Sequence, residues 1–217
     1  MMETALAAVH SNIDQPGIDQ VVPLQPVELG FAEFEQHGLV VLPHFLPVEL
    51  IQSLKKEVQH QAKLQPAAIG RANTLQLAQD IRRDKTCWLT GESIAQQLYM
   101  QQLNAILTQL NRSFFLGLTG YECHFSHYQP GDFYRTHLDA FSDQASRRVT
   151  SVCYLNDVEQ GGELVVYDEQ QQPVLILPPR AGTLILFESS RFPHEVKPTA
   201  QHRYSIAGWF RQDPPVF

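Results

Sequence analysis

The feature that most constrains the fold is a series of short apolar or alternating runs that begins near Tyr121. In order, these runs read ECHFSHY, FYRTHLD, VTSVCYL, ELVVY, PVLILP, TLILFE, HEVKP and YSIAGWF. Turn-forming residues separate them, at Pro130-Gly131, Asn156-Asp157, Gly161-Gly162, Pro178-Pro179 and Gly182. Short strands repeated at this spacing predict a β-sandwich or a barrel.

Upstream of these runs, the apolar residues follow helical spacing. Val27–His37 predicts a first helix that stops at Gly38, and Leu39–Leu42 predicts a short apolar strand. Pro47 is suited to open a second helix, in which apolar residues recur at every fourth position. The N-terminal part of the chain is therefore expected to be mainly helical.

A long third helix is predicted to begin near Ser93. Ser93 and Gln96 match the capping-box pattern of a helix N-terminus. The residues expected on its buried face are Ile94, Leu98, Leu103, Leu107, Leu110 and Phe114.

The order of these elements predicts an α+β fold, because helices come first and strands second. Helices over about residues 26–115 should buttress a jelly-roll core over about residues 119–212. We expect residues 26–217 to form a single domain. Residues 1–25 show no periodicity, so we expect a flexible leader there.

Composition disfavours several classes of function. With 16 Lys and Arg against 23 Asp and Glu, the net charge is −7, so we expect no nucleic acid partner. No apolar run is long enough to span a membrane, and the first residues do not resemble a signal peptide. Cys87, Cys123 and Cys153 are odd in number and contain no CxxC pair, which argues against a disulfide framework or a structural zinc site. We therefore expect a cytoplasmic protein.

His137-Leu138-Asp139 is the first candidate for chemistry. On a strand, residues i and i+2 point to the same face, so this imidazole and this carboxylate could bind one ion. His194, within the later run HEVKP, is the candidate for a third ligand. Two His and one carboxylate on one face of an octahedron leave open positions, an arrangement typical of iron(II) oxygenases.

Arg203 follows His194 by one strand length and strengthens this interpretation. An arginine on the strand of a small barrel ordinarily faces solvent. A guanidinium fixed near a metal could instead pair bidentately with the carboxylate of a dicarboxylic acid. The agreement of Arg203 with the three candidate ligands favours the second reading.

These residues form part of a longer pattern. In order, it reads Ile81-Arg82-Arg83-Asp84-Lys85…Trp88, Tyr128…Gly131…Tyr134…His137-Leu138-Asp139, Thr150…Tyr154-Leu155-Asn156, Gly161-Gly162-Glu163-Leu164, Pro193-His194-Glu195-Val196 and Arg203-Tyr204…Trp209. This pattern resembles the 2-oxoglutarate-dependent prolyl hydroxylases, and most closely the animal oxygen-sensing enzymes and their bacterial relatives. The resemblance covers about residues 80–211.

The resemblance implies a double-stranded β-helix, the jelly-roll core of this family. It implies that iron(II) is held by His137, Asp139 and His194. It implies that 2-oxoglutarate is bound by Arg203 and Tyr154, with Tyr128 lining the same pocket. The remaining co-substrate is O₂, and ascorbate is a candidate reductant.

The resemblance also implies roles around the substrate. Tyr134 and Trp209 would lie near the metal or the substrate. Asp84 and Arg147 would order a loop that covers the substrate. We therefore predict an Asp84–Arg147 ion pair at the mouth of the pocket, with the segment Gln65–Asp84 closing over a bound peptide.

The expected reaction is hydroxylation of a prolyl residue in a protein, with release of succinate and CO₂. The bacterial relatives suggest a translation factor as the target. Asp139 favours hydroxylation over halogenation, because related halogenases lack this carboxylate. The alternatives are the same chemistry on a small molecule or free amino acid, a nucleic-acid demethylase, a metal-dependent isomerase or cleaving enzyme, and a jelly-roll binding module without 2-oxoglutarate turnover.

Overall fold

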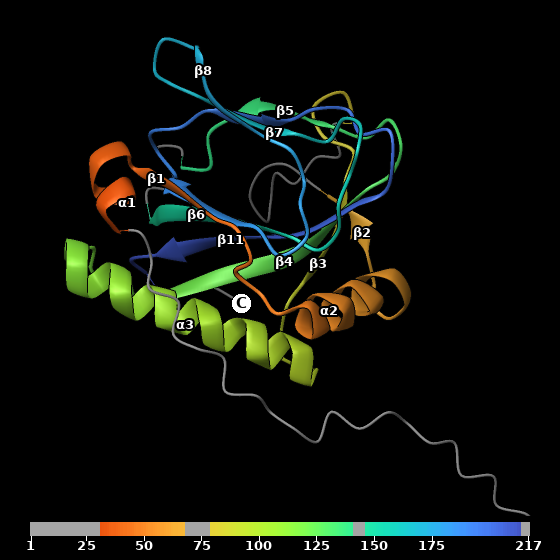
Figure 1. Cartoon of the computed structure of the whole chain (residues 1–217), viewed down its shortest axis with the longest axis horizontal. Coiled ribbons are helices and arrows are strands. Elements are labelled where there is room, and N and C mark those ends of the chain that lie inside the picture. The colour runs from red at the N-terminus through yellow and green to blue at the C-terminus, as the bar shows by residue number, and fades with distance from the viewer. Residues whose placement is uncertain (1–30, 68–78, 141–145, 214–217) are drawn as a thin grey trace, which may run out of the picture.

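The computed structural model describes residues 31–67, 79–140 and 146–213, which form two facing antiparallel sheets with helices on one side (Figure 1). The larger sheet contains, in spatial order, β1 (Leu39–Leu42), β9 (Leu184–Glu188), β6 (Arg147–Tyr154), β11 (Arg203–Arg211), β4 (Gly120–Tyr128), β3 (Lys85–Trp88) and β2 (Gln65–Pro66). The smaller sheet contains β5 (Tyr134–His137), β10 (His194–Val196), β7 (Leu164–Tyr167) and β8 (Pro173–Leu177). All eight predicted strands appear, as β4 to β11, and the predicted α+β jelly roll is confirmed.

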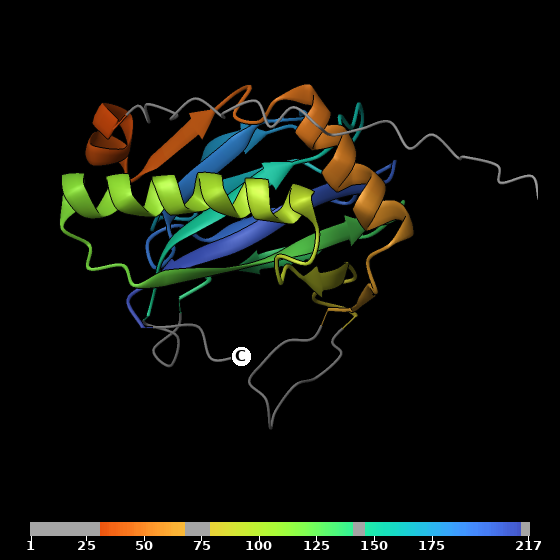
Figure 2. The same ribbon diagram turned by 90° about the horizontal axis from the view of Figure 1, so that it is seen from below.

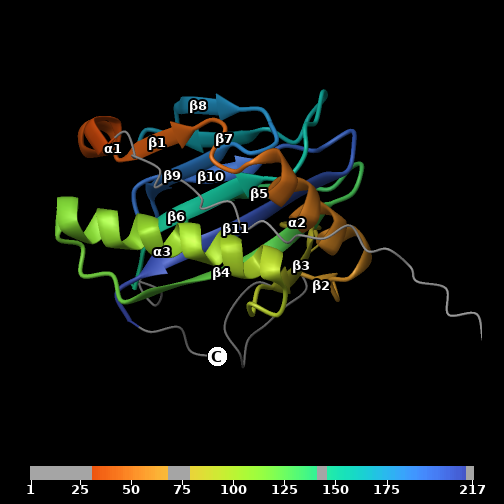
Figure 3. The ribbon, with the colours of Figure 1, turned by 60° about the horizontal axis from the view of Figure 1, so that its bottom comes forward.

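Three helices cover the outer face of the larger sheet (Figures 2 and 3). They are α1 (Phe31–His37), α2 (Val48–His60) and α3 (Ile94–Phe114). Gly38 ends α1 with a φ of 71°, a conformation that glycine adopts at little cost, and donates its N–H to the carbonyl of Phe34. Residues 27–30 of the predicted first helix, and the whole predicted leader 1–25, lie outside the described residues. No helix of the described ranges is long and apolar enough to cross a membrane.

The buried face of α3 differs from the predicted one. The Ser93 hydroxyl accepts a hydrogen bond from the N–H of Gln96 at 3.1 Å, so the predicted N-cap is confirmed. The prediction for Ile94 is wrong, because its side chain is 54% exposed. The predicted Leu103 and Leu110 are fully buried, Leu98, Leu107 and Phe114 are partly buried against the same core, and Tyr99 and Ile106 complete the fully buried face at the 3.6-residue helical period.

Strand β11 separates two interiors, because successive side chains point to opposite faces of a sheet. Tyr204, Ile206 and Phe210 pack into the core between the larger sheet and the helices. The side chains on the opposite face line a cavity between the two sheets; they are Arg203, Ser205, Ala207 and Trp209. The helices therefore support the sheet from behind and leave its inner face available for a site.

Two short strands, β2 and β3, extend the larger sheet beyond the predicted set. Lys85–Trp88 pairs antiparallel with β4, and Gln65–Pro66 pairs with β3. The sequence pattern does not predict them, because neither segment has an apolar alternation of its own. Their pairing brings Trp88 opposite His124 at the edge of the cavity.

Glu57 links α2 to the start of α3 through a buried polar cluster. Its side chain is only 9% exposed. Its carboxylate accepts hydrogen bonds from the Ser93 hydroxyl, at 2.7 Å, and from the side-chain amide of Gln96. The Gln96 amide oxygen in turn accepts from the backbone N–H groups of Thr90 and Gly91. This cluster therefore ties the N-terminal end of α3 to α2.

We expect Glu57→Ala to lower the free energy of unfolding by about 1–3 kcal/mol, because the buried donors of Ser93 and Gln96 would lose their acceptor. Chemical denaturation followed by circular dichroism would measure the change. The matched control is Gln59→Ala, two residues away on the exposed face of the same helix, which should change stability by less than about 0.5 kcal/mol. Equal stability of the two variants would contradict this role for Glu57.

Candidate metal and co-substrate site

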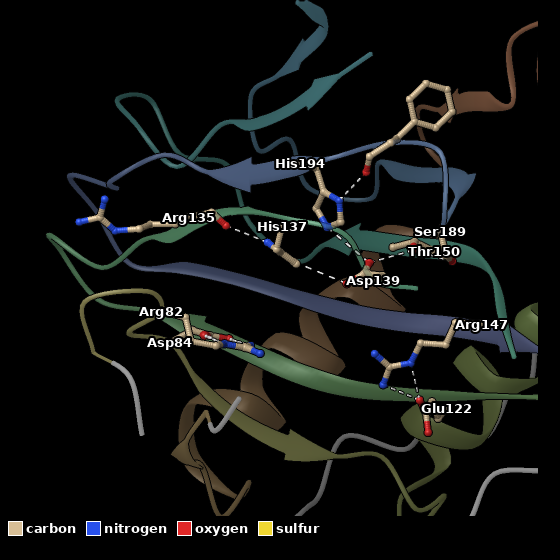
Figure 4. Close-up of polar contacts among 11 residues, drawn as sticks. Arg82, Asp84, Glu122, Arg135, His137, Asp139, Arg147, Thr150, Ser189 and His194 are labelled. Atoms are coloured by element: carbon tan, nitrogen blue, oxygen red, sulfur yellow. Dashed lines mark hydrogen bonds and ion pairs between the residues drawn. The ribbon is translucent and has the colours of Figure 1, made fainter. Parts of the chain in front are cut away.

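Three side chains predicted to bind a metal converge at the end of the smaller sheet. His137 is the last residue of β5, and His194 is the first residue of β10 and pairs directly opposite it. The potential ligand atoms of these two residues and of Asp139 all lie within 4.8 Å of one another. The Nε2 atoms of His137 and His194 lie 3.5 and 3.4 Å from the carboxylate oxygens of Asp139 (Figure 4).

Asp139 reaches this cluster from a bend and not from a strand. Because β5 ends at His137, the expectation that both residues share one strand is wrong, although their side chains do meet. The N–H of the next residue, Ala140, donates to the carbonyl of Ser189 at 3.3 Å, which ties the bend to the end of β9.

The two imidazoles are oriented by backbone carbonyls. The Nδ1 atom of His137 lies 2.8 Å from the carbonyl of Arg135, and the Nδ1 atom of His194 lies 3.0 Å from the carbonyl of Phe192 (Figure 4). A carbonyl can only accept, so each Nδ1 carries the proton. Each Nε2 therefore presents its lone pair toward Asp139, as a metal ligand requires.

Asp139 is a buried carboxylate with a polar support behind it. Its Oδ2 accepts a hydrogen bond from the Thr150 hydroxyl at 2.8 Å, and Thr150 also lies 2.9 Å from the Ser189 hydroxyl. Burial opposes the charge of the carboxylate, but coupling to the protonated forms of His194 and His137 outweighs burial, so the pKa of Asp139 lies well below its usual range. Asp139 is therefore an anion at neutral pH.

His194 is neutral at the same pH. Burial lowers its pKa to about 4, and the opposing effect of Asp139 does not restore it. Two imidazoles with their Nε2 atoms directed at one carboxylate are the donor set of a 2-His-1-carboxylate iron(II) site. The residues present therefore fit a divalent iron ion.

Arg203 is a buried cation without a carboxylate partner. Its side chain is 1% exposed, and it donates to the carbonyl of Gly162 and to the Ser205 hydroxyl, both at 3.0 Å. Among the described residues, no Asp or Glu forms an ion pair with it. A buried charge is normally paired, so this guanidinium is suited to receive the carboxylate of a ligand.

Two tyrosines enclose the guanidinium of Arg203. The rings of Tyr128 and Tyr154 lie with their centres 4.9 and 5.0 Å from its central carbon. Burial raises the pKa of both phenols, so they remain protonated and able to donate a hydrogen bond. The structure therefore brings together all three residues predicted to bind the co-substrate.

One cavity of about 1000 Å³ joins the two parts of the site. It is lined by the three metal-site residues and by Arg203. An aromatic group forms another part of its wall, in which Trp88 and Trp209 lie 5.1 and 5.5 Å from the ring of His124. Trp88 is 50% exposed, which places it at the rim of the cavity.

The predicted Asp84–Arg147 ion pair is wrong. Asp84 instead pairs with Arg82 through two contacts of 2.7 Å, while Arg147 donates to Glu122 from Nε and Nη2, at 2.9 and 2.6 Å (Figure 4). Arg147 also lies over the ring of Trp209, at 3.6 Å from its centre. Each arginine takes the nearest carboxylate, and Glu122 is adjacent to Arg147 because their strands both flank β11. Residues 68–78 of the predicted covering loop lie outside the described part of the chain.

Sequence reasoning missed several residues that support the site. Thr150 donates to Asp139, Ser189 contacts Thr150, and His124 contributes to the cavity wall. A signal existed for Thr150, which shares the inward face of β6 with Tyr154 by the two-residue period of a strand. No local pattern identifies Ser189, because its role depends on the packing of β9 against β6.

Comparison with known proteins identifies the class. The profile of the 2OG-Fe(II) oxygenase superfamily matches residues 123–211, which span the core from β4 to β11. A crystal structure of a prolyl-4-hydroxylase from Pseudomonas putida is similar with a TM-score of 0.75 and 34% identity, over 84% of this chain and 97% of that one. The chain therefore belongs to the 2-oxoglutarate- and iron(II)-dependent oxygenase superfamily, and the predicted use of iron(II) and 2-oxoglutarate is confirmed at the level of this family.

Two further relatives refine the assignment. Human Egl nine homolog 1 is 28% identical over 190 residues, which are 81% of this chain and 44% of that protein. A prolyl hydroxylase from Trichoplax adhaerens, in complex with a hypoxia inducible factor peptide fragment, shares the fold with a TM-score of 0.72 and 24% identity, over 83% of this chain and 86% of that one. The chain spans less than half the length of the curated relatives that it matches. Within the superfamily, the proteins that it resembles include prolyl hydroxylases.

Burial of a neutral imidazole predicts a pH dependence of stability. Burial lowers the pKa of His124 from 6.5 to about 4, so the unfolded chain binds a proton at a higher pH than the folded one. The free energy of unfolding should therefore fall as the pH decreases from about 6.5 to about 4, by up to about 3 kcal/mol for this residue. His124→Gln should flatten that part of the profile, measured by urea unfolding of the metal-free protein.

His194 contributes in the same direction, so the profile of His124→Gln should keep a slope. A profile for His124→Gln that matches wild type would rule out the buried neutral state of this imidazole.

Proposed function

We propose that the protein hydroxylates a prolyl residue in a protein substrate, consuming 2-oxoglutarate and O₂ and releasing succinate and CO₂. The observation that carries this proposal is the presence in one cavity of the cluster His137, Asp139 and His194 and of the unpaired cation Arg203. The first can hold a metal cation and the second a carboxylate. A single 2-oxoglutarate could contact both.

His137, Asp139 and His194 would hold the iron. The carbonyls behind each Nδ1 fix both imidazoles with their lone pairs toward the ion, and Thr150 fixes the carboxylate. With iron(II) bound, the site supplies the oxidative decarboxylation of 2-oxoglutarate by O₂, in which one oxygen atom enters succinate and the other the substrate C–H bond. The protein's own part is to place these three donors before the metal arrives.

Arg203 and Tyr154 would bind the distal carboxylate of 2-oxoglutarate. The guanidinium donates from Nε to the carbonyl of Gly162 and from Nη1 to the hydroxyl of Ser205. These two hydrogen bonds hold its plane, and Nη2 could donate to the ligand. The protonated phenols of Tyr154 and Tyr128 could donate to the same carboxylate. Because the guanidinium is buried, the contact would be stronger than an ion pair at the surface.

A peptide substrate is supported by the size and the wall of the cavity. A volume of about 1000 Å³ exceeds what 2-oxoglutarate fills, and the aromatic group at the rim offers apolar surface for a pyrrolidine ring. The related Trichoplax adhaerens enzyme has been crystallised with a peptide fragment. Arg147 and Trp209 contact each other and line the same cavity as the three candidate metal ligands, so they could contact such a peptide.

A translation factor as the target, ascorbate as a reductant and a cytoplasmic location stay predictions of the sequence. The same holds for the absence of a nucleic acid partner. A small molecule or free amino acid as the substrate is the competing outcome of the experiment below.

The proposal can be tested by incubating the protein with iron(II), 2-oxoglutarate and cell extract, followed by mass spectrometry of digested peptides. We expect one peptide to gain a single oxygen atom on proline, with matching formation of succinate. Replacing His137, Asp139 or His194 by Ala should abolish both signals, because three donors converge on one ion. Succinate without any modified peptide would instead indicate a small-molecule substrate, and succinate from an Asp139→Ala variant would remove that residue from the metal site.

The co-substrate assignment predicts a graded effect. Arg203→Ala should raise the KM for 2-oxoglutarate by about tenfold to a hundredfold, because a charge-assisted hydrogen bond contributes about 1.5–3 kcal/mol. Tyr154→Phe removes one hydroxyl and should have a smaller effect. Steady-state kinetics at saturating iron would measure both. An unchanged KM in Arg203→Ala would be incompatible with the assignment.

A further inference from the structure

A column of stacked side chains leads from a buried carboxylate to one of the metal-site imidazoles. The ring of Tyr134 stacks on that of His137, with centres 3.6 Å apart and planes inclined by 17°. The guanidinium of Arg82 lies over the Tyr134 ring, with its central carbon 4.3 Å from the ring centre. Asp84 holds Arg82 through two hydrogen bonds of 2.7 Å (Figure 4).

The column is attached to the strand that carries His137. Strand β5 has four residues and lies at the edge of the smaller sheet, and its pairing with β10 shifts register between His194 and Val196. Along its other edge, residues 81–83 run antiparallel to it. Arg82 forms a bridge with Tyr134, and the N–H of Arg135 donates to the carbonyl of Ile81 at 2.8 Å. The segment that supplies Arg82 thus also fixes the backbone of β5.

His137 needs support more than the other two residues of the cluster. Its side chain is 13% exposed, against 7% for Asp139 and 6% for His194. His194 packs against the ring of Phe187 at 4.8 Å. On the side of His137 that faces Arg82, the covering group is the ring of Tyr134.

The Arg82 guanidinium in this column keeps its positive charge. Asp84 is 1% exposed, so its pairing with Arg82 is shielded from water. Burial disfavours the charged guanidinium, but Asp84 outweighs burial and raises the pKa of Arg82 above its ordinary value. A cation over the face of a tyrosine ring is attracted by the ring's quadrupole, so Arg82 holds in place the ring on which His137 stacks.

We propose that Asp84, Arg82 and Tyr134 are positioning residues, which fix the plane of the His137 imidazole so that its Nε2 is held ready for the metal ion. The inference rests on the proposed function, because it assigns a purpose to the orientation of a metal ligand. It also replaces the expected pairing of Asp84 with Arg147. The series of contacts that begins at Asp84 passes through Arg82 and Tyr134 and reaches His137, not a covering loop.

The test uses Co²⁺, whose visible spectrum reports the geometry of its ligands without turnover. We expect Arg82→Met and Tyr134→Leu to weaken Co²⁺ binding about tenfold and to alter the spectrum, the size of effect typical for groups that orient a metal-binding histidine. Tyr134→Phe keeps the stacked ring and should stay within about twofold of wild type.

The matched control is Arg83→Met. Arg83 is the exposed neighbour of Arg82 and lies over the ring of Phe133, at 5.0 Å, without contact to His137. It should bind Co²⁺ as wild type does. Should Arg82→Met lose its circular dichroism spectrum, Asp84→Asn carries the test, because it keeps the shape of the partner and removes its charge.

The outcomes separate the two proposals. Wild-type affinity and spectrum in Arg82→Met, Tyr134→Leu and Asp84→Asn would overturn the positioning role and leave the metal site intact. Failure of the wild-type protein to bind Co²⁺ would overturn the proposed function itself. Equal weakening in Arg83→Met would also overturn the positioning role, because it would show a general loss of positive charge instead.

Discussion

The pairing of β10 with β5 is the interaction on which the site depends. It sets His194 opposite His137, although the two residues lie far apart in the chain, and it leaves Asp139 in the bend that follows. A shift of this register by one residue would turn one imidazole to the other face of the sheet. The carbonyls behind the two Nδ1 atoms then fix the orientation of the rings within that frame.

The cavity holds two buried charges of opposite sign that are not paired with each other. Asp139 is stabilised by the imidazoles and by Thr150, and Arg203 by neutral oxygens and two tyrosine rings. Each is costly to bury without a partner, so each is prepared for a ligand of the opposite charge. This separation explains how one cavity can accept a metal cation at one point and a dicarboxylate at another.

The rigidity that such a site requires comes from both sides of the larger sheet. The helices bury the outward face of β11, β4 and β6 in the main core, so the inward side chains of these strands have fixed positions. Glu57 joins α2 to α3 and completes this support. The smaller sheet lacks a helical layer in the described residues, and the segment 81–84 provides part of its support at the edge near His137.

Much of this architecture follows from local patterns in the chain. Alternation and turn residues predicted all eight strands of the core, and the capping pattern at Ser93 predicted the start of α3. The residues His137, Asp139, His194 and Arg203 could be proposed as a site because their side-chain chemistry and spacing suit one metal and one carboxylate. Such features depend on neighbours in sequence, and they survive in any fold that preserves the strands.

The tertiary structure decided which groups meet across the fold. Asp84 pairs with Arg82 two residues away, whereas Arg147 of β6 meets Glu122 of β4 only because both strands flank β11. The Arg147–Glu122 ion pair, the support of Asp139 by Thr150 and the contact of Arg82 with Tyr134 depend on distances between separate segments, which no local pattern contains.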